Sequence, residues 1–291
     1  MFLKRILFLV TYLPIRLCAL LPFSVLYKIS DLLSFLLFRV FNYRTKVIES
    51  NLRIAFPLLS PEGRAEIKQR FFRHFTDLFV ESLKNGFLSS TEFKNRFTVY
   101  NASLLDASIA KGKNVIVLLA HHGNWEWTAA IPLFTPHPVY GIYQKLNNPF
   151  FDRFIRKTRG AAGMHLVPTF ELKQTMDTNI KLGKSGVYGL ISDQSPMIKK
   201  TKHWFQFFTK TVPVHTGAEE LARAYSADIV LLSIRKVNRG FYSATFLPFE
   251  PQIDQSENYQ ITETYLKWVE REIVAQPETY LWTHKRFKHS R

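Results

Sequence analysis

Short apolar runs alternate with longer stretches of helical periodicity after residue 110. Runs of this length are typical of buried strands, and the stretches between them are long enough for helices. The expected strands are residues 114–120, 139–143, 164–167, 187–191 and 229–234, and the expected helices are residues 125–133, 150–159, 171–182 and 217–225. This alternation predicts an α/β fold with a mostly parallel central sheet flanked by helices.

The flanking residues predict further elements. Residues 42–100 have a helical pattern, in which Ser60 followed by Pro61 is a typical helix start. Residues 67–83 carry phenylalanines at helical spacing, which we interpret as a core-facing stripe. Residues 241–249 are interpreted as a late strand, with an antiparallel edge position as one option, and residues 258–275 as a final helix.

Residues 1–41 are strongly apolar but interrupted by charges. Arg16, Lys28 and Asp31 keep every uncharged stretch below the roughly 18 residues expected of a spanning helix. No small-residue cleavage site follows, so we expect a retained membrane anchor rather than a signal peptide. Two interfacial helices, one tilted span, and a pair of helices packed on the core all remain open. The expected division is an anchor over residues 1–41 and one folded domain over residues 42–291.

The composition narrows the range of partners. Lys and Arg exceed Asp and Glu by 39 to 23, a net charge of +16, which favours an anionic partner such as nucleic acid, an anionic membrane or an acidic carrier protein. No helix-turn-helix, RNA-binding or zinc pattern is visible, so nucleic acid is not the expected partner. Cys18 is the single cysteine, which excludes an intrachain disulfide and is consistent with a reducing cytosol.

Polar side chains follow three of the predicted strands where each strand ends. His121 and Glu126 follow the first strand, Gln144 follows the second, and Asp193 and Gln194 follow the fourth. Ligands of parallel sheets bind at the carboxyl ends of the strands, so these side chains are expected at one rim.

The spacing of His121 and Glu126 requires a bend. On a continuous helix the two side chains would diverge by roughly 140°, but Gly123 and Asn124 between them favour a turn. A carboxylate that holds an imidazole makes it a better base, which predicts proton abstraction from a hydroxyl. For His122 we expect packing or a capping hydrogen bond. No His-Glu-x-x-His, cysteine or Gly-x-Ser-x-Gly pattern is present, so neither a metal site nor a serine-hydrolase site is expected.

Four blocks in order resemble one known family. They are the His-x4-Glu string at residues 121–126, residues 147–160, residues 186–195 continued by 204–208 and 212–217, and the ending at residues 281–288. Together they are similar to the bacterial lipid A biosynthesis acyltransferases of the lauroyl and myristoyl type, within the lysophospholipid acyltransferase superfamily. The run from Phe208 to Thr216 departs from the family pattern, which bears on the acyl pocket or the acceptor more than on the chemistry.

The resemblance implies a glycerol-3-phosphate acyltransferase-like fold with an N-terminal hydrophobic helical anchor. It further implies transfer of a fatty acyl chain from the thioester of acyl carrier protein to a lipid hydroxyl of a lipid A precursor, at the cytoplasmic face of the bacterial inner membrane. No cofactor is expected, since the acyl-phosphopantetheine thioester is itself the donor substrate. Another acceptor, such as a lysophospholipid or an amino-acid lipid, and acyl-coenzyme A as donor are the alternatives.

Residue roles follow from this expectation. His121 is the expected general base, Glu126 is expected to fix its tautomer, and Arg159 is the candidate oxyanion donor together with backbone N–H groups near Gly123. Asp193 is expected either to orient Arg159 or to bind the acceptor. The residues expected to contact substrate or carrier are Asn124, Gln144, Arg156, Gln194, Lys199 and Lys200.

Overall fold

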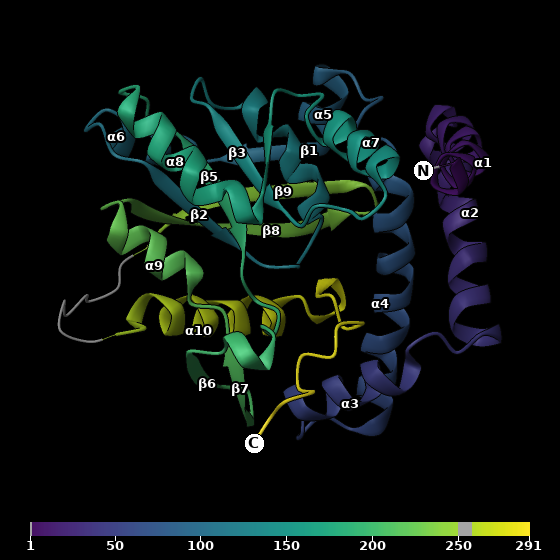
Figure 1. Ribbon diagram of the computed structural model, residues 1–291. Helices are drawn as coiled ribbons and strands as arrows, with labels where there is room; N and C mark the ends of the chain where they lie inside the picture. Colours follow the sequence, from purple (N-terminus) through teal and green to yellow (C-terminus); the bar gives the residue numbers. More distant parts are fainter. Residues whose placement is uncertain (1, 250–257) are drawn as a thin grey trace.

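Seven strands form the central sheet of the computed structural model, which describes residues 2–249 and 258–291 (Figure 1). Their spatial order is β1 (Phe97–Tyr100), β9 (Phe241–Pro248), β8 (Asp228–Asn238), β2 (Val115–Leu119), β5 (Val187–Ile191), β3 (Val139–Tyr143) and β4 (His165–Pro168). Within this sheet, β8 and β9 pair antiparallel, and the other neighbouring strands pair parallel. The predicted mostly parallel sheet is confirmed.

Strand β2 lies in the middle of this sheet, between β8 and β5, and all five of its residues are buried. A parallel strand that is covered on both faces reads as a continuous apolar run, which explains the sequence Val-Ile-Val-Leu-Leu. Its end delivers residues 120–126 to the carboxyl rim of the sheet. The site described below therefore begins at the best-buried strand of the fold.

Helices cover both faces. The helices α8 (Leu172–Lys181), α9 (Gly217–Ala224) and α10 (Gln260–Ala275) bury side chains in one core cluster. The 3₁₀ segment η2 (Trp125–Leu133), α5 (Ser90–Arg96) and α6 (Ser103–Ile109) contribute to the cluster on the other face. The short 3₁₀ turns are η3 (Thr169–Glu171), η4 (Ile198–Lys200) and η5 (Pro277–Thr279).

The N-terminal segment folds as helices along one side of the sheet (Figure 1). These are α1 (Phe2–Leu20), α2 (Phe23–Phe35), the π-helical turn η1 (Leu36–Val40), α3 (Thr45–Ala55) and α4 (Pro61–Ser82). As expected, the Ser60 side chain caps α4 by accepting a hydrogen bond from the Gly63 N–H. Helix α2 packs along α4, and α1 lies against α7 (Pro149–Arg159) through rings such as Phe8 and Phe154. No helix in the described ranges combines the length and apolar character needed to cross a bilayer.

The structure differs from the sequence-based picture, or adds to it, at three places. Strand β9 is antiparallel as expected but interior, because β1, which lies in a region expected to be helical, pairs on its outer side. Residues 203–214 form the unpredicted hairpin β6 (His203–Phe207) and β7 (Lys210–Val214). Residues 125–133 wind as a 3₁₀ helix rather than an α-helix, and Pro132 lies inside it. Short strands like these form through partners distant in sequence, which local periodicity does not reveal.

A buried ion network joins α2, α4 and the turn between β8 and β9. Asp77 of α4 is 1 % exposed and accepts hydrogen bonds from Ser30 Oγ of α2 at 2.8 Å and from the Arg239 guanidinium at 2.7 Å. Lys236 Nζ lies 3.3 Å from the same carboxylate, and Arg239 also binds Asp31 of α2. One buried carboxylate therefore fixes α2 to the rest of the protein.

We predict that Asp77→Ala lowers the free energy of unfolding by ~3 kcal/mol, because it leaves two cations without their buried partner. Asp31→Ala removes a half-exposed carboxylate from the same arginine and is expected to cost less than ~1 kcal/mol. Chemical denaturation in mild detergent compares the two variants. Equal destabilisation would contradict the central position of Asp77 in this network.

Candidate active site

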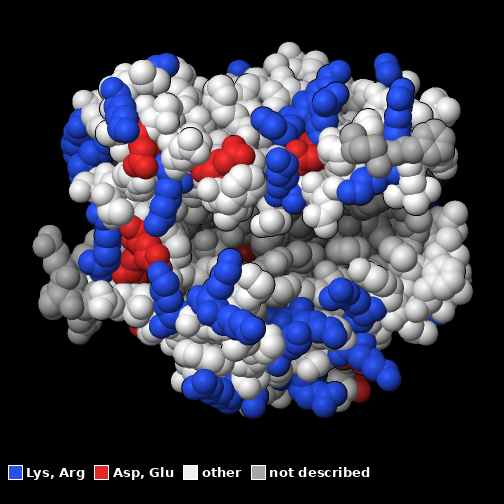
Figure 2. All heavy atoms as spheres, viewed as in Figure 1, with Lys and Arg blue, Asp and Glu red and all other residues white. Residues whose placement is uncertain are grey.

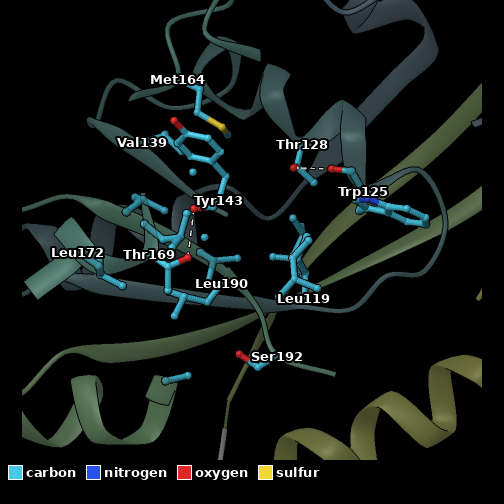
Figure 3. A pocket seen from close by; sticks show the side chains of 18 of the residues that line it. Leu119, Trp125, Thr128, Val139, Tyr143, Met164, Thr169, Leu172, Leu190 and Ser192 are labelled. Carbon is cyan, nitrogen blue, oxygen red and sulfur yellow. Dashed lines mark hydrogen bonds between the residues drawn. The ribbon is translucent and has the colours of Figure 1, made fainter. Parts of the chain in front are cut away.

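A cavity of about 670 Å³ opens at the carboxyl ends of β2, β3 and β5. Its walls are mostly apolar, and in Figure 3 Met164, Val139 and Tyr143 gather on one side while Trp125 lies on the other. The polar side chains that line it include His121, Glu126, Arg159, Gln144 and Gln194. The structure thus brings most of the predicted strand-end residues together at one cavity.

His121 is held by Asp193. The imidazole Nδ1 lies 2.7 Å from Asp193 Oδ1, and the backbone N–H of His121 donates to the same oxygen at 3.3 Å. Asp193 is fully buried. Burial alone would raise its pKa, but the His121 imidazole and the hydrogen bonds from it and from the backbone hold the pKa of Asp193 below its ordinary value. An ionised carboxylate only accepts, so Nδ1 is the donor in this pair, and in the neutral imidazole Nε2 is the acceptor nitrogen.

Glu126 does not hold the imidazole, which corrects the expected His121–Glu126 pairing. Its two carboxylate oxygens accept hydrogen bonds from Nε and Nη2 of Arg159, at 2.9 and 2.6 Å. Arg159 is the last residue of α7, while Glu126 lies in the first turn of η2. The bend directs Glu126 toward α7, and the carboxylate that meets His121 comes from the end of β5 instead. The expectation that Asp193 orients Arg159 is likewise wrong.

The bend requires glycine at position 123. Gly123 has φ +62°, and a Cβ there would lie 2.6 Å from the carbonyl oxygen of Ile234. The Gly123 N–H donates to the Thr279 carbonyl at 3.1 Å. The Gly123 N–H is therefore occupied, and the expected donor role of backbone N–H groups near Gly123 stays a prediction for its neighbours. His74 Nε2 approaches the Gly123 carbonyl at 3.2 Å and holds the bend from the α4 side.

Asn124 is a support for the bend rather than a substrate contact. It is fully buried; its side-chain oxygen accepts from the Trp127 N–H, and its amide donates to Glu81 Oε2 at 2.7 Å. Tyr242 also donates to Glu81. Burial and the nearby Asp77 carboxylate raise the pKa of Glu81 to about 7. The loop that carries His121 is thus anchored on a buried carboxylate of α4.

This chain is similar to known proteins over nearly its whole length. The model of the family described as bacterial lipid A biosynthesis acyltransferase matches residues 2–289. The chain belongs to this family. It is 25% identical over 272 residues to the lipid A biosynthesis lauroyltransferase of Escherichia coli (strain K12), covering 92% of this chain and 87% of the relative. It is 23% identical over 248 residues to the lipid A biosynthesis palmitoleoyltransferase of the same organism, covering 84% and 79%. The sequence-based family resemblance is confirmed, and the protein is an acyltransferase.

The C-terminal tail of this acyltransferase packs against the segments that carry His121 and Ser195, a contact that the sequence does not predict. The Leu281 N–H donates to the His121 carbonyl at 3.0 Å, and the Ser195 N–H donates to His284 Nε2 at 3.3 Å. Burial, the largest influence, lowers the pKa of His284 to about 4, so its ring is neutral with the proton on Nδ1. Arg286 is 1 % exposed and donates to Ser195 Oγ and to the Pro213 carbonyl. The Trp-x-His-x-Arg ending was visible in the sequence, but its position was not.

The remaining predicted substrate residues fall into two groups. Gln144 and Gln194 line the cavity, and the Gln194 side-chain nitrogen lies 3.5 Å from His121 Nε2. Arg156, Lys199 and Lys200 are exposed and lie outside the lining, so their docking role stays a prediction. Among the described residues, no group of three or more His, Cys, Asp or Glu side chains is placed to hold a metal ion.

His122 is structural, as expected. Its ring nitrogens lie 3.2 Å from the Ile234 carbonyl and 3.0 Å from the Gln276 carbonyl, and it is buried. Burial, and then the charge of Arg235, lower the pKa of His122 to about 4. His122 therefore links the loop at residues 121–126 to β8 and to the end of α10.

From this pKa we predict a pH dependence of stability. The ordinary pKa of 6.5 falls to about 4 in the folded state, so the unfolded chain binds the proton more strongly. The contribution of His122 is complete above pH 6.5 and is lost as the pH falls through 4. Between pH 6.5 and pH 4, the titration of His122 should cost the unsubstituted protein ~3 kcal/mol of unfolding free energy. The variant His122→Gln should not show this loss. Denaturant titrations across this range measure it, with His165→Gln, an exposed residue of the edge strand β4, as the control variant.

Proposed function

We propose that this protein transfers a fatty acyl chain from the thioester of acyl carrier protein to a hydroxyl of a lipid A precursor. The observation that carries the proposal is the His121–Asp193 pair at the mouth of an apolar cavity. The family and the names of the relatives support a lipid A-type acceptor. The pair supplies the base that an acceptor hydroxyl needs, and the cavity supplies the apolar surface that an acyl chain needs.

The chemistry is direct transfer. As the acceptor oxygen forms its bond to the thioester carbonyl carbon, its proton moves to His121 Nε2. The Asp193 carboxylate stabilises the imidazolium through Nδ1–H. The carbon–sulfur bond then breaks, and the leaving thiolate, whose conjugate thiol titrates near ~8.5, takes the proton back from Nε2. No covalent enzyme intermediate is required.

Arg159 and Gln194 are the proposed donors to the oxyanion of the tetrahedral intermediate. Glu126 uses Nε and Nη2 of Arg159, which leaves other N–H groups of the guanidinium for a ligand. Both residues line the cavity. The role of Glu126 is then to position Arg159, and one oxyanion donor is worth ~2.7–4 kcal/mol of transition-state stabilisation.

The acyl chain is proposed to lie along the sheet, away from His121. Side chains that point to one face of parallel strands recur every second residue, in layers roughly 6.6 Å apart. Val117, Gly141 and Gly189 are neighbours in register and form the second layer from the rim. The position of a Cβ at Gly141 is taken by the Met164 side chain, whereas the space over Gly189 is open, and the cavity extends past this layer to Val139 and Val187. Gly189 thus provides depth for a hydrocarbon chain.

Charge and apolar exposure support the proposed partners and location. Lys and Arg side chains gather around the hollowed face of the molecule in Figure 2, where they suit an acidic carrier protein and lipid phosphates. On α1, the exposed apolar residues include Leu3, Leu7, Val10, Leu13 and Leu17, each more than half exposed. Such a patch favours attachment to a membrane surface, here proposed as the cytoplasmic face of the inner membrane.

The base is tested by two substitutions that we expect to have the same effect. Asp193→Asn should lower kcat by roughly 10²–10⁴-fold, because the imidazole loses the carboxylate that fixes its tautomer. His121→Ala should do the same. The measurement is acyl transfer from a purified acyl carrier protein thioester to a lipid A precursor.

Glu126→Gln distinguishes this assignment from a His121–Glu126 pairing. The low-field proton resonance of the His121 Nδ1–H bonded to Asp193 should survive in Glu126→Gln and vanish in Asp193→Asn. Survival of that resonance in Asp193→Asn would reject Asp193 as the partner of His121. A thermal melt confirms that each variant is folded.

We also predict that filling the second layer of the cavity changes the preferred length of the acyl chain. A Cβ at Gly189 would meet only the Tyr140 carbonyl oxygen at 3.8 Å, so Gly189→Val fits the fold and fills the second layer of the cavity. The ratio of kcat/KM for donors from eight to sixteen carbons should shift toward shorter chains by roughly tenfold or more. Gly217→Val adds the same volume elsewhere on the lining, where its Cβ meets nothing within 4 Å, and is the matched control. An equal shift in both variants would contradict the glycine layer.

A further inference from the structure

A second hollow, of about 440 Å³, lies between α2 with its π-helical turn and α4. Its lining shares no residue with the active-site cavity. The helices α2 and α4 run side by side in Figure 1 and are in extensive contact. The lining residues are Asp31, Ser34, Phe35, Phe38, Arg39, Gln69, Phe72, Arg73 and Arg239.

Two of the three arginines in this hollow have no anionic partner. The Arg239 guanidinium forms ion pairs with Asp31 and Asp77. This pairing also neutralises the Asp31 carboxylate, which lies on the lining of the hollow. Within the described ranges, the guanidinium groups of Arg39 and Arg73 make no ion pair or hydrogen bond. Arg39 comes from the π-helical turn and Arg73 from α4, so the two helices present uncompensated positive charge to one space.

The floor and rim of the hollow are apolar. The rings of Phe38 and Phe72 stack with their centroids 3.5 Å apart, and Phe38 is buried. Phe35, also on the lining, is 57 % exposed; Leu32 of α2 is 57 % exposed and Phe41, directly after the π-helical turn, is 70 % exposed. The hollow therefore combines two free guanidinium groups with a strip of apolar surface open to the outside.

We propose that this hollow binds one anionic phospholipid of the surrounding bilayer. The phosphate lies between Arg39 and Arg73, because a guanidinium fork matches phosphate oxygens in charge and geometry. The Gln69 amide is a further donor on the same face of α4. The acyl chains run over Leu32, Phe35 and Phe41, whose exposure is otherwise unexplained for a protein in water. A soluble phosphate compound would satisfy the arginines but leave this apolar strip uncovered.

The bound lipid would contact the helix that the buried network fixes. Asp31, on the lining of the hollow, and Asp77 both form ion pairs with Arg239. Asp77 also accepts a hydrogen bond from Ser30 of α2. The site thus sits where α2 is fastened to α4. This proposal does not depend on which acceptor the active site acylates.

The test is binding of dihexanoylphosphatidylglycerol, below its micelle concentration, to the full chain by calorimetry or native mass spectrometry. We expect the double variant Arg39→Gln/Arg73→Gln to weaken binding by roughly tenfold or more, since two charge-assisted contacts are lost. Arg53→Gln/Arg271→Gln is the matched control, because it removes two exposed arginines outside the hollow. It should bind like the unsubstituted protein.

Each alternative has its own signature. Equal weakening in both double variants would mean diffuse attraction by the basic surface, and would overturn the proposal. Equal binding of dihexanoylphosphatidylcholine would mean that the phosphate charge is not recognised. Tight binding of inorganic phosphate alone at Arg39 and Arg73 would identify a soluble anion as the ligand. A thermal melt of each variant shows that lost binding is not lost folding.

Discussion

The hydrogen bond between His121 and Asp193 is the contact around which the site is built. It joins the ends of β2 and β5, which are neighbours in the sheet, so the two side chains are aligned by backbone pairing rather than by a flexible loop. Asp193 is fully buried and stays ionised because the imidazole and backbone N–H groups face it. In the proposed mechanism, a base that is fixed in this way needs little reorganisation when the acceptor oxygen arrives.

Much of the surrounding structure serves to hold the bend at residues 121–126. The tail holds it through Leu281 and Thr279, α4 holds it through His74 and Glu81, and β8 holds it through His122. These contacts come from segments far apart in the chain. They explain why an apparently minor C-terminal ending is part of the site.

The sequence predicted what local patterns encode. The continuous apolar runs predicted the buried parallel strands, and their ends located His121, Asp193 and Gln194 at one rim. It did not predict which carboxylate meets the imidazole, because Glu126 is near in sequence whereas Asp193 is near only through the pairing of β2 with β5. Strands β1, β6 and β7 were missed for a related reason: each is four or five residues long and is stabilised by a partner rather than by its own periodicity.

The carboxylates that α4 shares with α2 and with the loop of His121 have a consequence for any truncation of the N-terminal helices. Tyr27 and Ser30 of α2 donate to Glu81 and Asp77, and Glu81 in turn holds Asn124 beneath the base. Cutting the chain after residue 41 would strip those hydroxyl groups from two neighbouring acids and open them to water. Removing residues 1–41 would therefore also disturb the loop that carries His121, and the exposed leucines of α1 are the better positions at which to reduce apolar surface.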